Sequence, residues 1–309
     1  MERNKTVICF EGINNRVWEI LGLFTEDMLV EMEFYSNQAR DILGIDCYRK
    51  LVLGKTDNEI ENAYTELVGT YISNYVIFKY FIKYGIKPDL LIGFSLGLNT
   101  AMASSGYISF KDGLDILVVN RHCMEYFYEH GNYGMAFIVG LSLKVVQSII
   151  EEKGMIGKVK IASETSEYSI LITGEKYGID VIEKRILEEG AMHFNRINSY
   201  IPFHYNLHND FVDQKLNKID DIKVKNGCYK VFSIYSLEMV EEKDIHDELK
   251  KNIYSPMNWR RTISELEDMG YKDFWDVSIT ASNKKMSLLK EKDSTFYTFK
   301  HFKTKYFIS

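Results

Sequence analysis

Residues 93–97, Gly-Phe-Ser-Leu-Gly, are the strongest chemical signal in the chain. The pattern G-x-S-x-G is typical of a nucleophile elbow, in which a serine stands on a sharp turn between a strand and a helix. The apolar run 90–92 precedes the pattern as a strand would, and a helical pattern follows it. Ser95 is therefore the candidate nucleophile. The alternative is a loop in which these five residues occur by chance.

The two glycines of the pattern have a physical reason. A side chain at residue 93 or 97 would collide with the neighbouring strand or helix at so sharp a turn. The turn also leaves Ser95 at a helix N-terminus, where free N–H groups and the helix dipole favour negative charge. We therefore expect the backbone N–H of Leu96 to stabilise an oxyanion.

A nucleophilic serine needs a general base, and histidine is the usual one. The chain contains 7 histidines. We favour His204, because it follows Ile201-Pro202-Phe203 just after a predicted strand. His208, one helical turn later, competes for the same role. The alternative for His204 is a partly buried histidine that caps the next helix.

The composition excludes several classes of protein. Of the 309 residues, 46% are hydrophobic and 27% are charged, as in an ordinary globular protein. A net charge of −6 without a lysine or arginine cluster argues against a nucleic-acid binder. The 4 cysteines are scattered, so neither a metal site nor a disulfide framework is predicted. Because the sequence shows no signal peptide and no apolar run of membrane-spanning length, we expect a cytoplasmic protein.

The elements around Ser95 predict an α/β fold with a parallel sheet. Buried strands are expected at 6–10, 90–92, 229–235 and 272–278, and a long helix at 57–84. A ferredoxin-like order of strand, helix, strand, strand, helix, strand is predicted at 135–139, 142–153, 158–162, 168–173, 177–189 and 191–197. We therefore expect a large domain of residues 1–131 and 199–309, with a small α+β subdomain of residues 132–198 inserted. Residues 285–309 predict no architecture.

Seven segments, in order and with compatible gaps, make the chain similar to the malonyl-CoA:acyl-carrier-protein transacylase family. They are Phe10-Glu11-Gly12-Ile13 for the family's F-P-G-Q, residues 93–97 for G-H-S-L-G, 118–124 for a helix with a carboxylate-binding arginine, 134–141 for G-x-M-A-A-I-x-G-L, 166–174 for S-P-x-Q-x-V-I-x-G, 201–204 for the catalytic histidine and 254–259 for Y-N-P-V-x-W. The resemblance implies a hydrolase-like α/β core with an inserted ferredoxin-like subdomain.

The resemblance also implies roles for the matched residues. Ser95 takes the acyl group from coenzyme A, and His204 acts as general base and then as the acid that protonates the leaving thiol. A backbone carbonyl near Asn258, rather than an aspartate side chain, orients the histidine. The backbone N–H groups of Ile13 and Leu96 form the oxyanion hole.

Arg121 is implied to bind the free carboxylate of malonate. The residue type suits the task, because a planar guanidinium holds a carboxylate through two hydrogen bonds. An unpaired arginine in an otherwise apolar helix would also be costly. The alternative is a surface arginine on the solvated face of that helix. Phe94 and Phe203 are expected to shape the pocket, and Phe203 resembles the malonyl-selective version of its segment.

The chain departs from the family at several matched positions. Ile13 replaces the glutamine of F-P-G-Q, and Phe94 replaces the histidine before the serine. The family's R-G-x-x-M-Q has become a helix that ends in His122-Cys123-Met124-Glu125. Such drift favours a specialised polyketide-pathway enzyme over a housekeeping enzyme of fatty-acid synthesis.

The predicted activity is transfer of malonyl from malonyl-CoA to the phosphopantetheine thiol of a holo acyl carrier protein, through a seryl ester. We expect no bound cofactor, no metal, no nucleic acid and no membrane partner, and we expect a monomer. Two alternatives stay open. One is an editing acyl hydrolase on the same fold, against which Arg121 argues, since that branch lacks the arginine. The other is a non-catalytic carrier-binding homologue, which the retention of Ser95, Arg121 and His204 together disfavours.

Overall fold

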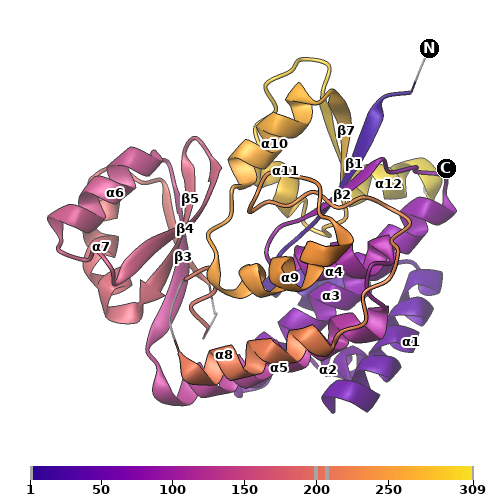
Figure 1. Ribbon diagram of the computed structural model, residues 1–309, viewed down its shortest axis with the longest axis horizontal. Helices are drawn as coiled ribbons and strands as arrows, with labels where there is room; N and C mark the ends of the chain where they lie inside the picture. The colour runs from indigo at the N-terminus through magenta and orange to yellow at the C-terminus, as the bar shows by residue number, and fades with distance from the viewer. Residues whose placement is uncertain (1–2, 198–200, 206–208, 308–309) are drawn as a thin grey trace.

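The first of two sheets is parallel and contains the strand that leads to Ser95. The computed structural model describes residues 3–197, 201–205 and 209–307, and Figure 1 shows both sheets. The first sheet has the order β2-β1-β7-β8, and every pairing in it is parallel. Its strands are β1 (Lys5–Phe10), β2 (Leu90–Gly93), β7 (Tyr271–Asp276) and β8 (Thr295–Thr298). The continuous apolar sequences of β1 and β2 suit a sheet that helices cover on both faces.

Helices complete the large domain around this sheet. α4 (Gly97–Ser105) follows the elbow and packs against β1 and β2. α3 (Glu59–Lys83) packs against α4 and is buried along most of its length. The other helices of this domain are η1 (Asn15–Gly22), α1 (Glu26–Leu43), α2 (Cys47–Leu53), α5 (Phe110–His130), α8 (Asp210–Leu216), η2 (Asn217–Asp221), η3 (Glu242–Asp244), α9 (Ile245–Tyr254), α10 (Trp259–Asp268), α11 (Ser282–Met286) and α12 (Phe299–Tyr306).

The second sheet is antiparallel and has a hydrophobic core of its own. Its order is β4-β5-β3-β6, the ferredoxin-like arrangement, with two helices packed on it. The elements are β3 (Tyr133–Val139), α6 (Leu143–Glu152), β4 (Val159–Ser166), β5 (Ser169–Glu175), α7 (Lys176–Glu188) and β6 (His193–Ile197). Buried isoleucines and valines from the sheet and both helices form that core. The fold class expected from the sequence is confirmed, while the subdomain limits 132 and 198 stay a prediction.

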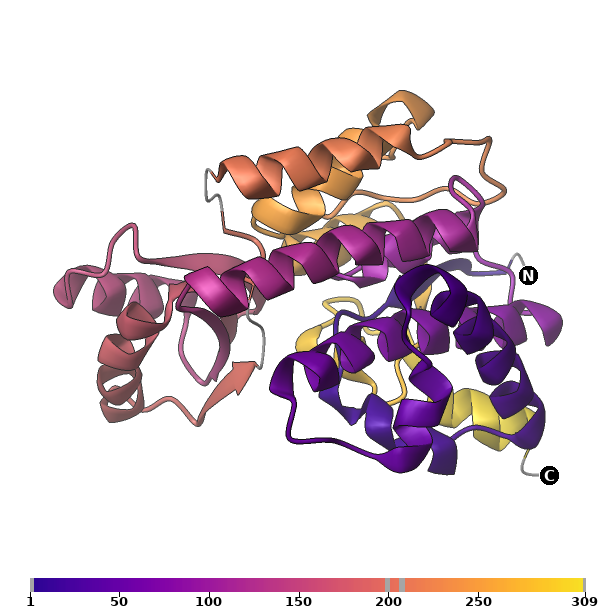
Figure 2. The same ribbon diagram turned by 90° about the horizontal axis from the view of Figure 1, so that it is seen from below.

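α5 joins the two sheets. It begins with a capping box, in which the side chains of Ser109 and Asp112 each bond the other residue's backbone N–H. Figure 2 shows this helix running from the large domain to the edge of the small one, with α8 alongside it. Because β3 begins three residues after α5 ends, the helix sets where the small sheet lies relative to the elbow.

Three details differ from the expected elements. Residues 229–235 form only isolated bridges, at Val231 and Phe232, because the Ser233 hydroxyl accepts the backbone N–H groups of Tyr235 and Ser236 and starts a turn. The sequence pattern also predicts a helix over residues 205–216, but α8 begins only at Asp210, after Asn209 as N-cap. The C-terminal region folds as β8 and α12. Within the described ranges, no helix combines the length and apolarity needed to cross a bilayer.

Candidate active site

Ser95 stands on a strained turn between β2 and α4. Its φ is 53°, in the left-handed region that residues other than glycine rarely adopt. A Cβ on Gly93 would lie 2.2 Å from the backbone of Gly97, and a Cβ on Gly97 would lie 2.2 Å from the carbonyl oxygen of Phe10. The two glycines therefore allow β1, β2 and α4 to approach closely enough to hold the serine in this conformation.

His204 lies beside Ser95. The distance from Ser95 Oγ to His204 Nε2 is 3.0 Å, although the two residues are far apart in the sequence. His204 is also in the left-handed region, with φ 60°, and its backbone N–H donates to the carbonyl of Ile253 at 2.7 Å. Burial lowers the pKa of His204 to about 4, so the ring is neutral at pH 7 and can accept the serine proton. The competing candidate, His208, lies outside the described residues.

A backbone carbonyl orients the histidine ring, and it belongs to Ser255. Nδ1 of His204 lies 3.2 Å from this carbonyl oxygen, so Nδ1–H donates to it and the Nε2 lone pair faces the serine. We expected a backbone carbonyl near Asn258 in this role. The carbonyl belongs instead to Ser255, three residues earlier in the chain. Ser255 caps the C-terminus of α9, where helix carbonyls are left without partners. The Asn258 side chain instead donates to the carbonyl of Tyr235 at 3.0 Å.

Two backbone N–H groups near Ser95 are available as donors. Leu96 follows the serine, and Ile13 lies in the loop after β1. A Cβ on Gly12 would lie 3.3 Å from Ser95 Cβ, so this loop passes directly against the elbow. Within the part of the chain that the structure describes, neither the Ile13 nor the Leu96 N–H donates to a protein acceptor. Their assignment to an oxyanion hole stays a prediction.

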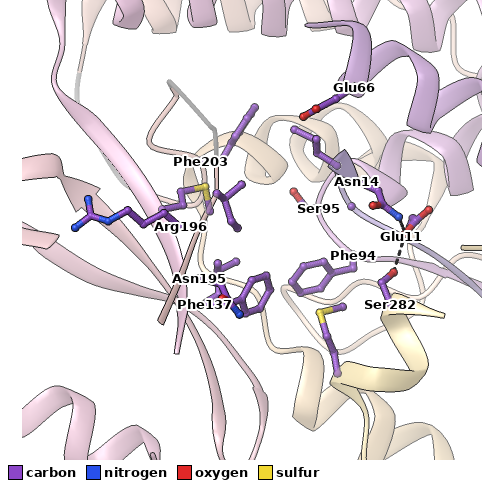
Figure 3. Close-up of a pocket in the computed structure, with 16 residues that line it drawn as sticks. Glu11, Asn14, Glu66, Phe94, Ser95, Phe137, Asn195, Arg196, Phe203 and Ser282 are labelled. Atoms are coloured by element: carbon purple, nitrogen blue, oxygen red, sulfur yellow. Dashed lines mark hydrogen bonds between the residues drawn. The ribbon is translucent and has the colours of Figure 1, made fainter. Parts of the chain in front are cut away.

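A cavity of about 280 Å³ opens beside Ser95, and loops and helices of the large domain and strands of the second sheet line it (Figure 3). Phe94 and Phe203 line it from the large domain, where we expected them. The Phe94 ring contacts Trp259 edge to face, with the ring centroids 5.3 Å apart, so the aromatic core of the domain fixes its position. Phe137 lines the opposite side from β3 of the small subdomain.

Arg121 lies outside this cavity, and its expected role is therefore corrected. Its Nε donates to Glu125 Oε1 at 2.7 Å, and its Nη1 donates to the carbonyl of Leu43 at 3.0 Å. The guanidinium also lies over the Tyr64 ring, 5.0 Å from the centroid. The side chain is 42% exposed and lines a different cavity from that of Ser95. The alternative interpretation, a surface arginine on the solvated face of the helix, describes it.

The register of α5 explains this error. In the pattern R-G-x-x-M-Q the arginine stands four residues before the methionine, and Asn120 stands four residues before Met124. Both residues are buried, at 3% exposure, on the inner face of the helix. Arg121 is rotated from Asn120 by about 100° around the helix axis. The matched position therefore carries an amide, and the argument from Arg121 against a hydrolase no longer holds.

Glu11 is a buried acid on the cavity wall for which we expected no role. Its side chain is 1% exposed, and its Oε2 accepts from Asn14 Nδ2 and Ser282 Oγ, both at 2.8 Å. Burial and the nearby charge of Asp276 raise the pKa of Glu11 to about 8, so the carboxyl is neutral at pH 7. The sequence contained a signal, since Glu11 stands where the family pattern F-P-G-Q has proline.

Other polar and aromatic residues that line the cavity were also missed. Arg196, Asn195 and Phe137 come from the small subdomain, and Glu66 comes from α3. Their sequence neighbourhoods contain no motif that connects them to Ser95. Packing of the small sheet against the elbow brings three of them to the cavity, and that arrangement is set by contacts between distant segments.

Comparisons with known proteins agree on one family. No protein-family model matches the chain. The chain is 28% identical over 220 residues to the malonyl CoA-acyl carrier protein transacylase of Bacillus subtilis. The aligned region covers 70% of the chain and 68% of that relative. It is 26% identical over 270 residues to the protein of the same name from Buchnera aphidicola, with 85% of each chain covered.

Solved structures show the same fold. One is a malonyl-transacylase in complex with a type II polyketide synthase acyl carrier protein, with TM-score 0.81, 18% identity and 95% of each chain covered. Another is the malonyl CoA-acyl carrier protein transacylase of Coxiella burnetii, with TM-score 0.79, 20% identity, and 96% of this chain and 93% of that chain covered. These likenesses confirm the two-part α/β architecture.

Proposed function

Because the chain belongs to the malonyl-CoA:acyl-carrier-protein transacylase family, we propose that it transfers acyl groups, malonyl among them, from coenzyme A to the thiol of an acyl carrier protein. One observation carries the proposal. Ser95 Oγ lies 3.0 Å from Nε2 of a buried His204 that is neutral at pH 7, on a nucleophile elbow. Such a pair is what a serine needs in order to attack a thioester.

The first half-reaction forms an ester on Ser95. His204 Nε2 takes the hydroxyl proton as Oγ attacks the thioester carbonyl, and the N–H groups of Ile13 and Leu96 stabilise the oxyanion that forms. When the tetrahedral intermediate collapses, the C–S bond breaks and the protonated histidine gives its proton to the departing sulfur of coenzyme A. The Ser255 carbonyl holds Nδ1–H throughout, so the ring keeps its orientation.

The second half-reaction returns the enzyme to its starting state. The phosphopantetheine thiol of the carrier gives its proton to His204 Nε2 and attacks the Ser95 ester. The ester C–O bond breaks, the acyl group leaves as a carrier thioester, and the serine recovers its proton from the histidine. The bonds and protons of the two half-reactions balance without an oxidant, a reductant or a metal. The buried Nε2, with a pKa lowered to about 4, releases its proton readily after each attack.

Intact-protein mass spectrometry tests this proposal. The chain is mixed with malonyl-CoA for the first half-reaction, and a holo carrier is then added. We expect one malonyl group on the wild-type protein, none on Ser95→Ala, and transfer only to a carrier that bears phosphopantetheine. His204→Ala should slow acylation by about 100- to 10,000-fold, whereas the matched variant His208→Ala should not. Absence of any acyl adduct on the wild type would reject the proposal.

The same experiment separates transfer from editing hydrolysis. If the ester on Ser95 is released to water faster than to a holo carrier, the chain is a hydrolase. We further propose a polyketide carrier as the partner and a monomeric enzyme. A solved complex of similar fold between a transacylase and a type II polyketide carrier supports the first of these. Transfer rates to polyketide and fatty-acid carriers, and the mass in solution, test them.

A further inference from the structure

The cavity beside Ser95 is mainly apolar. Its hydrophobic lining comes from loops of the large domain, from the second sheet and from α11: Ile13, Phe94, Met135, Phe137, Leu171, Ile197, Phe203 and Met286. The hydroxyl of Ser282, the other lining group on α11, already donates to Glu11. An acyl chain attached to Ser95 therefore meets aromatic rings and aliphatic side chains, which suit an uncharged group.

Three basic side chains at or around this cavity are each paired with a carboxylate. Arg196 lines it, but its Nη1 lies 2.6 Å from Asp180 and its Nη2 pairs with Glu183, both on α7. Figure 3 shows its guanidinium pointing away from Ser95. The side chain of Lys55 reaches the buried face of α3, where it forms an ion pair of 3.0 Å with Glu66. Arg121 is bound to Glu125, as described above.

Residues 198–200 and 206–208 flank His204 in the sequence and lie outside the described residues. They contain one histidine, His208, and no lysine or arginine. Among the described residues that line the cavity, Arg196 is the one basic side chain. Within this described part of the lining, a carboxylate bound beside Ser95 would therefore find no unpaired cation as its partner.

Acidic groups also face the cavity. Glu66 is 5% exposed, and its Oε1 accepts from Trp18 Nε1 at 2.8 Å and pairs with Lys55. Glu11 adds a buried carboxyl whose Oε1 has no hydrogen-bond partner among the described residues. A substrate carboxylate would lose its hydration here and lie near a carboxylate of like charge, and both effects are unfavourable. An uncharged acyl group would lose little by entering.

We infer that this cavity gives Ser95 a further activity, the transfer of short uncharged acyl groups at least as readily as malonyl. The inference rests on the proposed function, because it uses the same ester on Ser95 and the same exchange of thiols. Oγ attacks the carbonyl of an acyl-CoA such as acetyl-CoA or butyryl-CoA, and coenzyme A leaves with the proton that His204 carried. A carrier thiol then takes the acyl group and restores the serine hydroxyl.

A competition experiment tests the choice of acyl group. The chain is given equal concentrations of malonyl-CoA, acetyl-CoA and butyryl-CoA, and the esters on Ser95 are resolved by mass within the first turnover. We expect the uncharged esters to equal or exceed the malonyl ester. Preference for malonyl by about 100-fold or more, as a dedicated cation would give, overturns the inference. If no donor acylates the serine, the proposed function fails instead.

Two variants link the preference to the charges. Glu66→Gln removes a carboxylate and frees Lys55, so the malonyl-to-acetyl ratio should rise by about tenfold, with Glu61→Gln on the same helix as matched control. Acetyl transfer reports in each case that the variant is folded. Arg196→Met should leave the ratio unchanged, and a selective loss of malonyl transfer in it would show that this guanidinium binds the carboxylate, contrary to the inference.

Discussion

Replacing Glu11 by glutamine should make the stability of the protein less dependent on pH. The Glu11 side chain is 1% exposed, and burial together with Asp276 raises its pKa from 4.5 to about 8. Glutamine has the same shape, and its amide oxygen can accept from Asn14 and Ser282 as Oε2 does. It cannot ionise, so the change removes one titration and keeps the contacts.

The expected magnitude follows from the two pKa values. Between pH 4.5 and about 8, the carboxyl is protonated in the folded protein and ionised in the unfolded chain, so folding takes up a proton. The free energy of unfolding therefore falls as pH rises, by about 1.4 kcal/mol per pH unit. Between pH 4.5 and about 8, the free energy of unfolding of the wild type should fall by about 4 kcal/mol more than that of Glu11→Gln. Below pH 4.5 the carboxyl is protonated in both states, and the two proteins should show a constant difference.

Urea unfolding followed by tryptophan fluorescence, at intervals from pH 5 to pH 8, measures this slope. The difference in unfolding free energy between variant and wild type is the informative quantity, because the titration of Asp276 contributes to both proteins. Glu129→Gln, at a side chain that is 69% exposed, is the matched control and should show no such slope. A difference for Glu11→Gln that stays constant across the range would refute the reasoning.

Other regions give further predictions. Gly97→Ala should abolish acylation and lower solubility, because its Cβ would lie 2.2 Å from the Phe10 carbonyl; Gly22→Ala, with no atom within 4 Å of the new Cβ, should change neither. The rate of Ser95 acylation should stay constant down to about pH 5 and fall near pH 4, because His204 stays neutral until the pH reaches its lowered pKa. Stopped-flow measurements of acylation across this pH range test the expected fall. Phe302→Ala should lower the free energy of unfolding by about 3–5 kcal/mol in urea titrations, because this α12 ring is fully buried against Phe81, at 4.7 Å between centroids.

The parts of the fold that depend on local sequence could be predicted. The elbow was found because its glycines are needed within five consecutive residues, and the small subdomain because six short elements follow one another in order. Residues 229–235 show the limit of such patterns. Their apolar run resembles a strand, but the Ser233 hydroxyl binds the N–H groups of Tyr235 and Ser236, and that local turn prevents pairing beyond the bridges.

The parts of the site that depend on distant contacts were harder to predict. His204 was one of several candidate histidines until its Nε2 was placed 3.0 Å from Ser95. Ser255 could not be identified from its side chain, because its contribution is a main-chain carbonyl at the end of α9. Glu66 and Arg196 have no motif, and they meet at the cavity only because the fold brings α3 and β6, which are far apart in the sequence, to it.

The Arg121 error shows why function can change while a motif survives. On a helix, a shift of one residue rotates a side chain by about 100°, which is enough to move it from a cavity to solvent. The chain keeps an arginine one position beyond the family's, so the letters look similar, but the residue that faces inward is Asn120. With an amide at that position, Arg196 is the one basic side chain among the described residues that line the cavity, and it is paired with Asp180 and Glu183. Selectivity for a charged acyl group then depends on side chains that neighbouring carboxylates already hold, and the uncharged donors gain by comparison.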